Sequence, residues 1–391
     1  MKRLFIGNFH FEQTLCHSAG ITLPSSLQRL NDELACAWIP VTELGDAVWV
    51  PKSIEPEYFN QLAASGLPRV TPISARNDLQ EKFELCPWGW NSEIQDSSAL
   101  HYAEFSAPPL ESVRQVNSRR FSFQQEQHEN VELPGSAMIQ SLDQLDDILR
   151  NQKDDRQSWV LKAEFSMSAR ERLLGIGRSM SVPDRNWASK RLKRESVLFF
   201  EPWVQRIAEV GLQFDIPISE PPELLGITPL LADSHGRYCG SGFDTEAASN
   251  QNWKSAIDIA KRACEEMQSR GYFGPVGIDA VRYLDDYGEE QIRPLQDINA
   301  RWTMGRLSLG LRRLLKPDES GIWWHTRWPT ENSDAPRAAY QQFENMLPPQ
   351  IHAIRTSPFS VNGQPVAYAT IALIGESGFS VADWVKQHLA E

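Results

Sequence analysis

Short apolar runs alternate with polar, helix-compatible stretches over about the first 110 residues. Runs of this length are typical of buried β-strands, so the pattern predicts a small α/β domain over residues 1–110. No Gly-x-Gly-x-x-Gly fingerprint follows the first run, which leaves a dinucleotide-binding site of the Rossmann type without support. The predicted strands are residues 4–6, 35–39 and 47–50.

Beyond residue 110 the pattern indicates a second structural unit. Residues 112–127 form a helix-compatible stretch that leads through a Leu-Pro-Gly turn to a helix at residues 142–149. Two apolar runs then predict strands, one over Trp159–Lys162 and one over Val197–Val204.

A long amphipathic helix is predicted over residues 253–270. Its apolar positions recur at intervals of three and four residues, which gives one buried stripe, and Gly271 is placed to end it. The stripe consists of Ala256, Ala260, Ala263 and Met267.

The two runs that follow this helix predict a β-hairpin. Residues 276–283 and 291–300 read as strands, and the four residues from Asp285 to Gly288 have turn chemistry. If the turn is centred near Gly288, Asp279 lies directly opposite Asp297. Asn299 shares the face of Asp297, because side chains two apart on a strand point the same way.

Three oxygen-bearing side chains therefore meet on one face of the predicted hairpin. Opposed carboxylates destabilise a sheet unless a cation lies between them, and oxygen ligands favour magnesium held jointly with phosphates. The pattern predicts a magnesium site; two solvated strand carboxylates are the alternative that spacing alone leaves open.

Composition limits the remaining functions. A chain of 391 residues exceeds a single core, so two or three subdomains with clefts are expected. No apolar run approaches a membrane span, no signal peptide is apparent, and the five cysteines are scattered without metal spacing. We expect a soluble, cytoplasmic protein.

The formal net charge of −12 opposes general binding to nucleic acid. One local exception is the segment 178–194, which holds six Lys and Arg residues and one Asp. This segment either attracts an anion or is a solvated helix face, and the sequence leaves both readings open.

The residues of the hairpin resemble a known superfamily. Gly277-Ile-Asp279 in one strand and Asp297-Ile-Asn299-Ala-Arg301 in the next are similar to the ATP-grasp superfamily, whose second strand usually carries Glu-x-Asn-x-Arg. The resemblance implies that Asp279, Asp297 and Asn299 hold Mg²⁺ bridging the phosphates of ATP, and that Arg301 contacts an acyl phosphate or the substrate. Aspartate replaces the usual glutamate at position 297, which leaves open whether one or two metal ions bind.

Other positions match the superfamily in order over about residues 111–315. Lys162 looks like the lysine that contacts the nucleotide phosphates, and Arg120 like an earlier phosphate-contacting lysine, although Arg119 matches equally well. Glu201-Pro202-Trp203-Val204 is similar to the linker that recognises adenine, and Glu209 is placed for the ribose. Pro202 lacks an N–H, so the adenine contacts fall to the carbonyl of residue 201 and the amide of Trp203 or Val204. Residues 165–170 resemble the mobile lid only weakly.

The resemblance implies a fold and a reaction class. The expected fold is α/β: a small α/β domain at 1–110, then two α+β lobes that clasp the nucleotide at 111–200 and 201–330, and an accessory element at 331–391. The implied activity is an ATP- and Mg²⁺-dependent carboxylate-amine or carboxylate-thiol ligase acting through an acyl phosphate. An ATP-grasp kinase or a non-catalytic nucleotide-binding protein is the alternative. The implied partners are small carboxylate and amine substrates, anionic ones included, and a homodimer is compatible with the resemblance.

Overall fold

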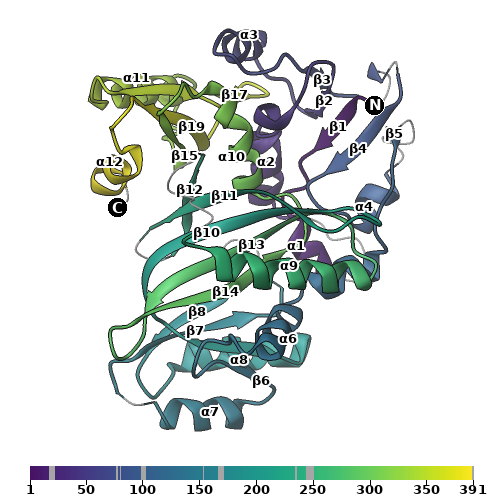
Figure 1. The fold of residues 1–391 in the computed structure, drawn as a ribbon. Coiled ribbons are helices and arrows are strands. Elements are labelled where there is room, and N and C mark those ends of the chain that lie inside the picture. The colour runs from purple at the N-terminus through teal and green to yellow at the C-terminus, as the bar shows by residue number, and fades with distance from the viewer. Residues whose placement is uncertain are drawn as a thin grey trace.

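The computed structural model describes residues 1–16, 23–75, 78–79, 81–97, 103–152, 154–165, 171–233, 236–243 and 251–389. It contains three main β-sheets, of five, four and eight strands, and a separate two-stranded hairpin. Figure 1 shows the four-stranded sheet as a small lobe below the eight-stranded sheet. The five-stranded sheet and the C-terminal helices lie above the eight-stranded sheet. Among the described residues, no helix has both the length and the apolar character needed to cross a bilayer.

The five-stranded sheet is parallel and has the order β3-β2-β1-β4-β5. Its helices connect neighbouring strands, as expected for an α/β domain. The strands are β1 (Arg3–Ile6), β2 (Ala47–Trp49), β3 (Thr71–Ile73), β4 (Phe83–Pro87) and β5 (Ala103–Glu104). The helices are α1 (Phe11–Leu15), α2 (Ser25–Leu34), α3 (Pro56–Ala64) and α4 (Ser92–Gln95).

The predicted strand at residues 35–39 is wrong. This run closes α2 and enters a short 3₁₀ helix, η1 (Ile39–Val41). Trp38 is fully buried, and its ring lies 5.1 Å from that of Phe5 and 5.3 Å from that of Trp302. The run is apolar because it is enclosed between two sheets, and a short buried run does not by itself distinguish a strand from a turn.

The small lobe is an antiparallel sheet in the order β6-β9-β7-β8, covered by two helices. Its strands are β6 (Ala137–Ile139), β7 (Ser158–Ala163), β8 (Arg172–Ile176) and β9 (Leu198–Pro202), and its helices are α7 (Leu142–Arg150) and α8 (Val182–Glu195). The helix-compatible stretch before this lobe forms two helices, α5 (Leu110–Val116) and α6 (Arg119–Glu129). They separate at Ser118, whose hydroxyl caps α6 by accepting a bond from the amide of Arg120.

The large sheet is antiparallel and has the order β14-β13-β10-β11-β12-β15-β19-β16. Its strands are β10 (Gln205–Ile216), β11 (Glu223–Ala232), β12 (Tyr238–Gly242), β13 (Gly274–Leu284), β14 (Glu290–Asn299), β15 (Ser320–Arg327), β16 (Ile351–Arg355) and β19 (Tyr368–Gly375). The last 60 or so residues thus extend the sheet of the predicted hairpin. They also supply α11 (Ala335–Met346), α12 (Val381–His388) and the hairpin β17 (Ser360–Val361) and β18 (Gln364–Pro365), which turns at Asn362-Gly363.

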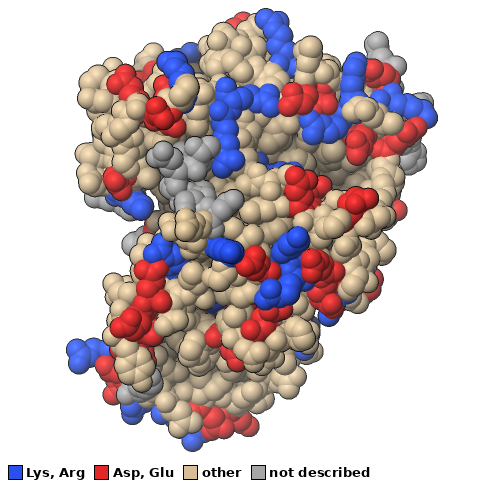
Figure 2. All heavy atoms as spheres, in the orientation of Figure 1, with Lys and Arg blue, Asp and Glu red and all other residues tan. Residues whose placement is uncertain are grey.

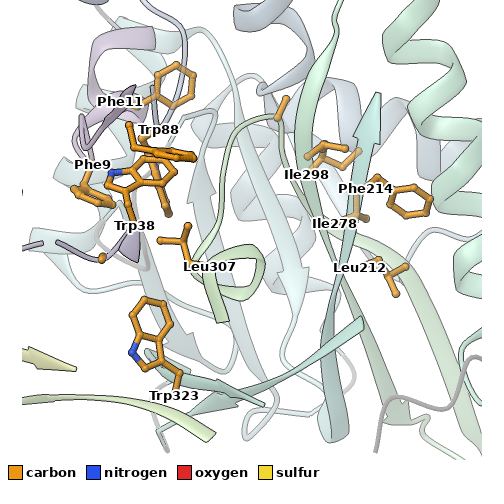
Figure 3. Close-up of a cluster of buried hydrophobic side chains, with 14 of the residues drawn as sticks. Phe9, Phe11, Trp38, Trp88, Leu212, Phe214, Ile278, Ile298, Leu307 and Trp323 are labelled. Atoms are coloured by element: carbon orange, nitrogen blue, oxygen red, sulfur yellow. The ribbon is translucent and has the colours of Figure 1, made fainter. Parts of the chain in front are cut away.

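One apolar core joins the five-stranded sheet to the large sheet. Helix α9 (Lys254–Ser269) lies along one face of the large sheet, and its predicted stripe of Ala and Met is buried there. The core continues on the other face, where α10 (Met304–Leu309) inserts Leu307 near Trp38 and Trp88 (Figure 3). This continuity fixes the first 110 residues against the end of β14, the strand that carries the candidate site.

Candidate functional site

The predicted pairing of Asp279 with Asp297 is present in the β13–β14 hairpin. Close to the turn the strands pair with a different register, Leu284 opposite Glu290, so the turn is centred one residue before Gly288. A bulge opposite Ala280, within residues 294–296, adds two residues to β14 and restores the predicted opposition. Pro294 lacks the N–H that a regular ladder needs, so it favours a bulge at this edge strand.

The two opposed carboxylates differ in their partners. Asp297 accepts a hydrogen bond from Arg119 Nη2 at 3.1 Å, whereas Asp279 makes no hydrogen bond or ion pair within the described part of the chain. Burial raises the pKa of Asp279 well above its usual range, and the charges of Asp297 and Glu209 raise it further. Asp279 is thus a half-buried acid without a partner among the described residues, and it faces a second acid. A divalent cation between the two carboxylates would offset their repulsion.

The donor set fits magnesium when phosphate oxygens complete it. Asn299 lies opposite Gly277, two residues beyond Asp297, so its amide oxygen shares the face of the carboxylates. Among the residues that the structure describes, no cluster of three or more His, Cys, Asp and Glu side chains could hold a metal by itself. Mg²⁺ typically takes one or two carboxylates and leaves its other positions to phosphate and water, which matches this set.

Arg301 is placed differently from the sequence expectation. Strand β14 ends at Asn299, and the Arg301 guanidinium turns toward the five-stranded sheet. Its Nε donates to Glu12 Oε1, its Nη1 to the carbonyl of Trp302 at 2.8 Å, and its Nη2 to Asn299 Oδ1 at 2.9 Å and to Glu12. A guanidinium has five N–H donors, so about one remains for a ligand in this arrangement.

Lys162 belongs to a buried charged network that connects the two lobes. Its Nζ lies 2.7 Å from Glu201 Oε2, and Arg293 of β14 lies 3.0 Å from the same oxygen. Arg293 also makes a two-pronged contact with Glu126 of α6, at 2.6 and 2.9 Å. Burial would raise the pKa of Glu201, but Arg293 and Lys162 outweigh it and hold that pKa well below its usual range.

The network limits the part that Glu201 can play in the adenine linker and brings in two residues that the sequence analysis did not name. The Glu201 side chain is directed at Lys162 and Arg293, so only its backbone is available to the adenine linker. Neither Arg293 nor Glu126 was named from the sequence. Arg293 could have been noticed as an arginine inside a predicted strand, 291–300, whose apolar residues indicate burial. Burial lowers the pKa of Lys162, while the neighbouring Glu201 opposes that shift.

Arg119, rather than Arg120, approaches the carboxylate pair. Besides its bond to Asp297, Arg119 donates from Nη1 to the carbonyl of Ala163 at 2.9 Å. Arg120 points to Glu164, 3.5 Å away, and to the sulfur of Met138. The cap at Ser118 sets this phase of α6, and the sequence could not distinguish the two adjacent arginines.

The predicted adenine linker lines a cavity of about 1140 Å³. Trp203, Val204 and Glu209 all contribute to its wall, together with Arg206. The amide of Trp203 donates to the carbonyl of Ser158 at 2.9 Å, so the amide of Val204 is the one left for a ligand. Glu209 connects this cavity to the carboxylate pair, because Gln296, next to Asp297, donates to Glu209 Oε1 at 3.1 Å.

The basic segment at residues 178–194 is mostly neutralised by acidic neighbours. Arg185 pairs with Asp146, and Arg191 pairs with Glu171 and Glu195. In Figure 2 the visible face carries acidic and basic side chains interspersed. The segment thus reads as a solvated, salt-bridged helix face. The predicted lid at 165–170 lies outside the described residues, except for Phe165.

Solved structures share this fold at low sequence identity. N5-carboxyaminoimidazole synthetase from Staphylococcus aureus, complexed with ADP, aligns with a TM-score of 0.54 and 9% identity over 99% of this chain and 96% of that chain. Biotin carboxylase from Campylobacter jejuni, in a β,γ-ATP complex, gives 0.53 and 10% over 96% and 87%. The Aspergillus clavatus N5-carboxyaminoimidazole synthase, complexed with ADP and 5-aminoimidazole ribonucleotide, gives 0.51 and 12% over 99% and 96%.

The fold of the chain is therefore the ATP-grasp fold, and the predicted α/β architecture is confirmed. At these identities the likeness extends to the fold alone. No family model matches the sequence, and no curated protein matches it either.

Proposed function

We propose that this protein is an ATP- and Mg²⁺-dependent ligase that joins a carboxylate to an amine through an acyl phosphate. The observation that carries the proposal is an opposed pair of carboxylates in an ATP-grasp fold: Asp279, which has no partner among the described residues, and Asp297, which pairs with Arg119 of α6. The solved neighbours complexed with ADP or ATP support the nucleotide, and their names, a synthetase, a synthase and a carboxylase, support an ATP-dependent bond-forming reaction.

Asp279, Asp297 and Asn299 would hold Mg²⁺ against the phosphates of ATP. When bound, the metal would supply positive charge that offsets the charge developing on the transferred phosphoryl group. Val204 would offer its backbone amide to the adenine from the wall of the cavity, and Glu209 would accept from the ribose hydroxyls.

Two basic side chains, Lys162 of β7 and Arg119 of α6, would orient the phosphates. Lys162 can turn from Glu201 to a phosphate oxygen, because Glu201 keeps its contact with Arg293. Arg119 lies at Asp297 and would contact the same phosphate group. The substrate carboxylate then attacks the γ-phosphorus, ADP leaves, and an amine displaces phosphate from the acyl phosphate, with positioning and charge as the main catalytic effects.

A second candidate is a nucleotide-binding protein without turnover. The bonds of Arg301 favour this candidate, because almost all of its N–H donors are used within the protein and few remain for an acyl phosphate or a substrate. An ATP-grasp kinase is the third reading that the fold allows, and it would transfer phosphate to one stable product.

ADP release with pooled substrates distinguishes the three functions. The purified protein is incubated with Mg-ATP and N-acetylated amino acids as acids, amino-acid amides as amines, or both pools together, and ADP is measured by coupled assay. Release that requires both an acid and an amine supports the ligase. Release with a single phosphorylated product selects the kinase, and ATP binding without release selects the non-catalytic protein.

We expect Lys162→Met to weaken ATP binding while the fold is retained. Methionine keeps the apolar stem but loses the charge, and a hydrogen bond to a charged group is worth roughly 1.5–3 kcal/mol, or about a 10- to 100-fold change in Kd. Isothermal titration calorimetry with Mg-ATP measures the effect. Lys190→Met, an exposed lysine of α8, is the matched control. Equal ATP affinity in the two variants would show that Lys162 only balances Glu201.

A further inference from the structure

Strand β14 ends in a tight turn that separates two residues of the candidate site. The amide of Arg301 donates to the carbonyl of Asn299 at 2.8 Å, which closes a three-residue turn centred on Ala300. Asn299, before the turn, keeps the face of the carboxylate pair, whereas the guanidinium of Arg301, after the turn, binds Glu12. The positions of these two side chains therefore depend on how the backbone of Ala300 is held.

The side chain of Asn117 holds that backbone through both of its polar groups. Its Oδ1 accepts from the amide of Ala300 at 2.9 Å. Its Nδ2 donates to the carbonyl of Ala300 at 3.2 Å and to the carbonyl of Val113 at 2.8 Å. A side-chain amide offers the same donor and acceptor as a peptide group. Asn117 thus pairs with the chain as a neighbouring strand would, just past the last residue of β14 that pairs with β13.

Asn117 also lies at the start of the segment that reaches the carboxylate pair from α6. It ends α5, and the next residue, Ser118, caps α6. Arg119, the first residue of α6, donates to Asp297 Oδ2 at 3.1 Å. Three consecutive residues therefore contain two contacts with the end of β14, one at Asp297 and one at Ala300. The two contacts fix the distance between the basic side chain of α6 and the end of this strand.

We propose that Asn117 is a positioning residue of the candidate metal site, which sets Asn299 in place relative to Asp297 and Arg301. The inference rests on the proposed function for the identity of the ligand, Mg²⁺ held with nucleotide phosphates. Groups that orient the ligands of a metal typically change its affinity by about 10- to 100-fold, although they do not touch it. Without the Asn117 amide, the N–H and C=O of Ala300 lose their partner and the turn is no longer held.

The Mg²⁺ dependence of nucleotide binding tests this role without requiring turnover. Isothermal titration calorimetry follows the binding of AMP-PNP, a non-hydrolysable ATP analogue, over a series of Mg²⁺ concentrations for wild-type protein and Asn117→Leu. Leucine fills a similar volume but has neither donor nor acceptor. We expect the Mg²⁺ concentration that gives half of the maximal effect to rise about 10-fold or more. Affinity for adenosine should stay at the wild-type value, because adenosine carries no phosphate and needs no metal.

Gln268→Leu is the matched control, because the amide of Gln268 also joins a helix to backbone carbonyls. It donates to the carbonyls of Pro217 and Glu220 at 2.6 and 2.8 Å, between β10 and β11. This variant should lose thermal stability and keep the wild-type Mg²⁺ dependence. Asn117→Ala, which introduces no larger apolar group, is measured beside Asn117→Leu and should show the same rise.

A lower unfolding temperature with unchanged Mg²⁺ dependence in both Asn117 variants would overturn the proposal, because Asn117 would then only join α5 to the large sheet. Wild-type protein that binds AMP-PNP equally well without Mg²⁺ would reject the metal site of the proposed function, and the positioning role with it. A shifted Mg²⁺ dependence in a protein that ligates no acid to an amine would support the positioning role and reject only the ligase reaction.

Discussion

Asp297→Asn is expected to lower ATP turnover by two or more orders of magnitude. The substitution preserves the shape of the side chain and an oxygen for the Arg119 contact, but it removes one of the two opposed charges that would hold Mg²⁺. Loss of one preorganised charge contact in a transition state typically costs about 10²–10³ in rate. Steady-state ADP release, measured over a range of Mg²⁺ concentrations, tests this expectation.

The control for Asp297→Asn is Glu290→Gln, which neutralises a carboxylate at the turn end of the same strand. Glu290 pairs with Arg282 there, far along β14 from the candidate site. Its turnover should match that of the wild type. Asp297→Asn should unfold at the same temperature as the wild-type protein or higher, because it relieves the repulsion on Asp279. A variant that turns over ATP at a near-normal rate would remove Asp297 from the metal site and with it the main support for catalysis.

Arg293→Met is expected to destabilise the protein by about 3–5 kcal/mol, the cost typical of leaving a buried charge without its partner. Arg293 is 5% exposed and joins Glu126 and Glu201 of the small-lobe side to β14 of the large sheet. Methionine fills a similar volume but leaves Glu126 with no cation. Burial already raises the pKa of Glu126 even beside Arg293, so its ionised form would become still less favourable. Urea denaturation at pH 7 measures the free energy of unfolding.

Arg262→Met provides the comparison for this effect. Arg262 of α9 also pairs with a glutamate of α6, Glu129, but its side chain is half exposed. Surface pairs contribute about 0–1 kcal/mol, so this variant should lose little stability. Adding Glu126→Gln to Arg293→Met should restore part of the stability, because it removes the unpaired charge. Equal, small losses for the two arginines would show that the buried network is not a stability element, and the lobes would then be held by apolar contacts alone.

Local features of the sequence were enough to predict the hairpin and the long helix. The α9 stripe spans about three turns of helix, and the turn chemistry between β13 and β14 lies within a few residues of both strands. Both patterns depend on neighbours along the chain, so they can be read without knowledge of the fold. The opposition of Asp279 and Asp297 was predicted correctly from a turn placed one residue too late, because the bulge within residues 294–296 compensated for the error.

Tertiary structure alone decided which charged groups meet. Glu12 and Arg301 are 289 residues apart, and Glu126 and Arg293 are 167 apart, so no spacing rule relates them. The fold also chose Arg119 over Arg120, through the cap at Ser118 that sets the phase of α6.

Tertiary contacts also decided where the C-terminal strands belong. Strands β16 and β19 read in isolation as an accessory element, yet they complete the large sheet by pairing with one another and with β15. The sequence determined the elements, their caps and the hairpin of the candidate site, because these follow from local backbone and side-chain preferences. The packing of the three sheets determined which charged side chains of the candidate site are paired, buried or left for a ligand. Those contacts form only when distant segments come together.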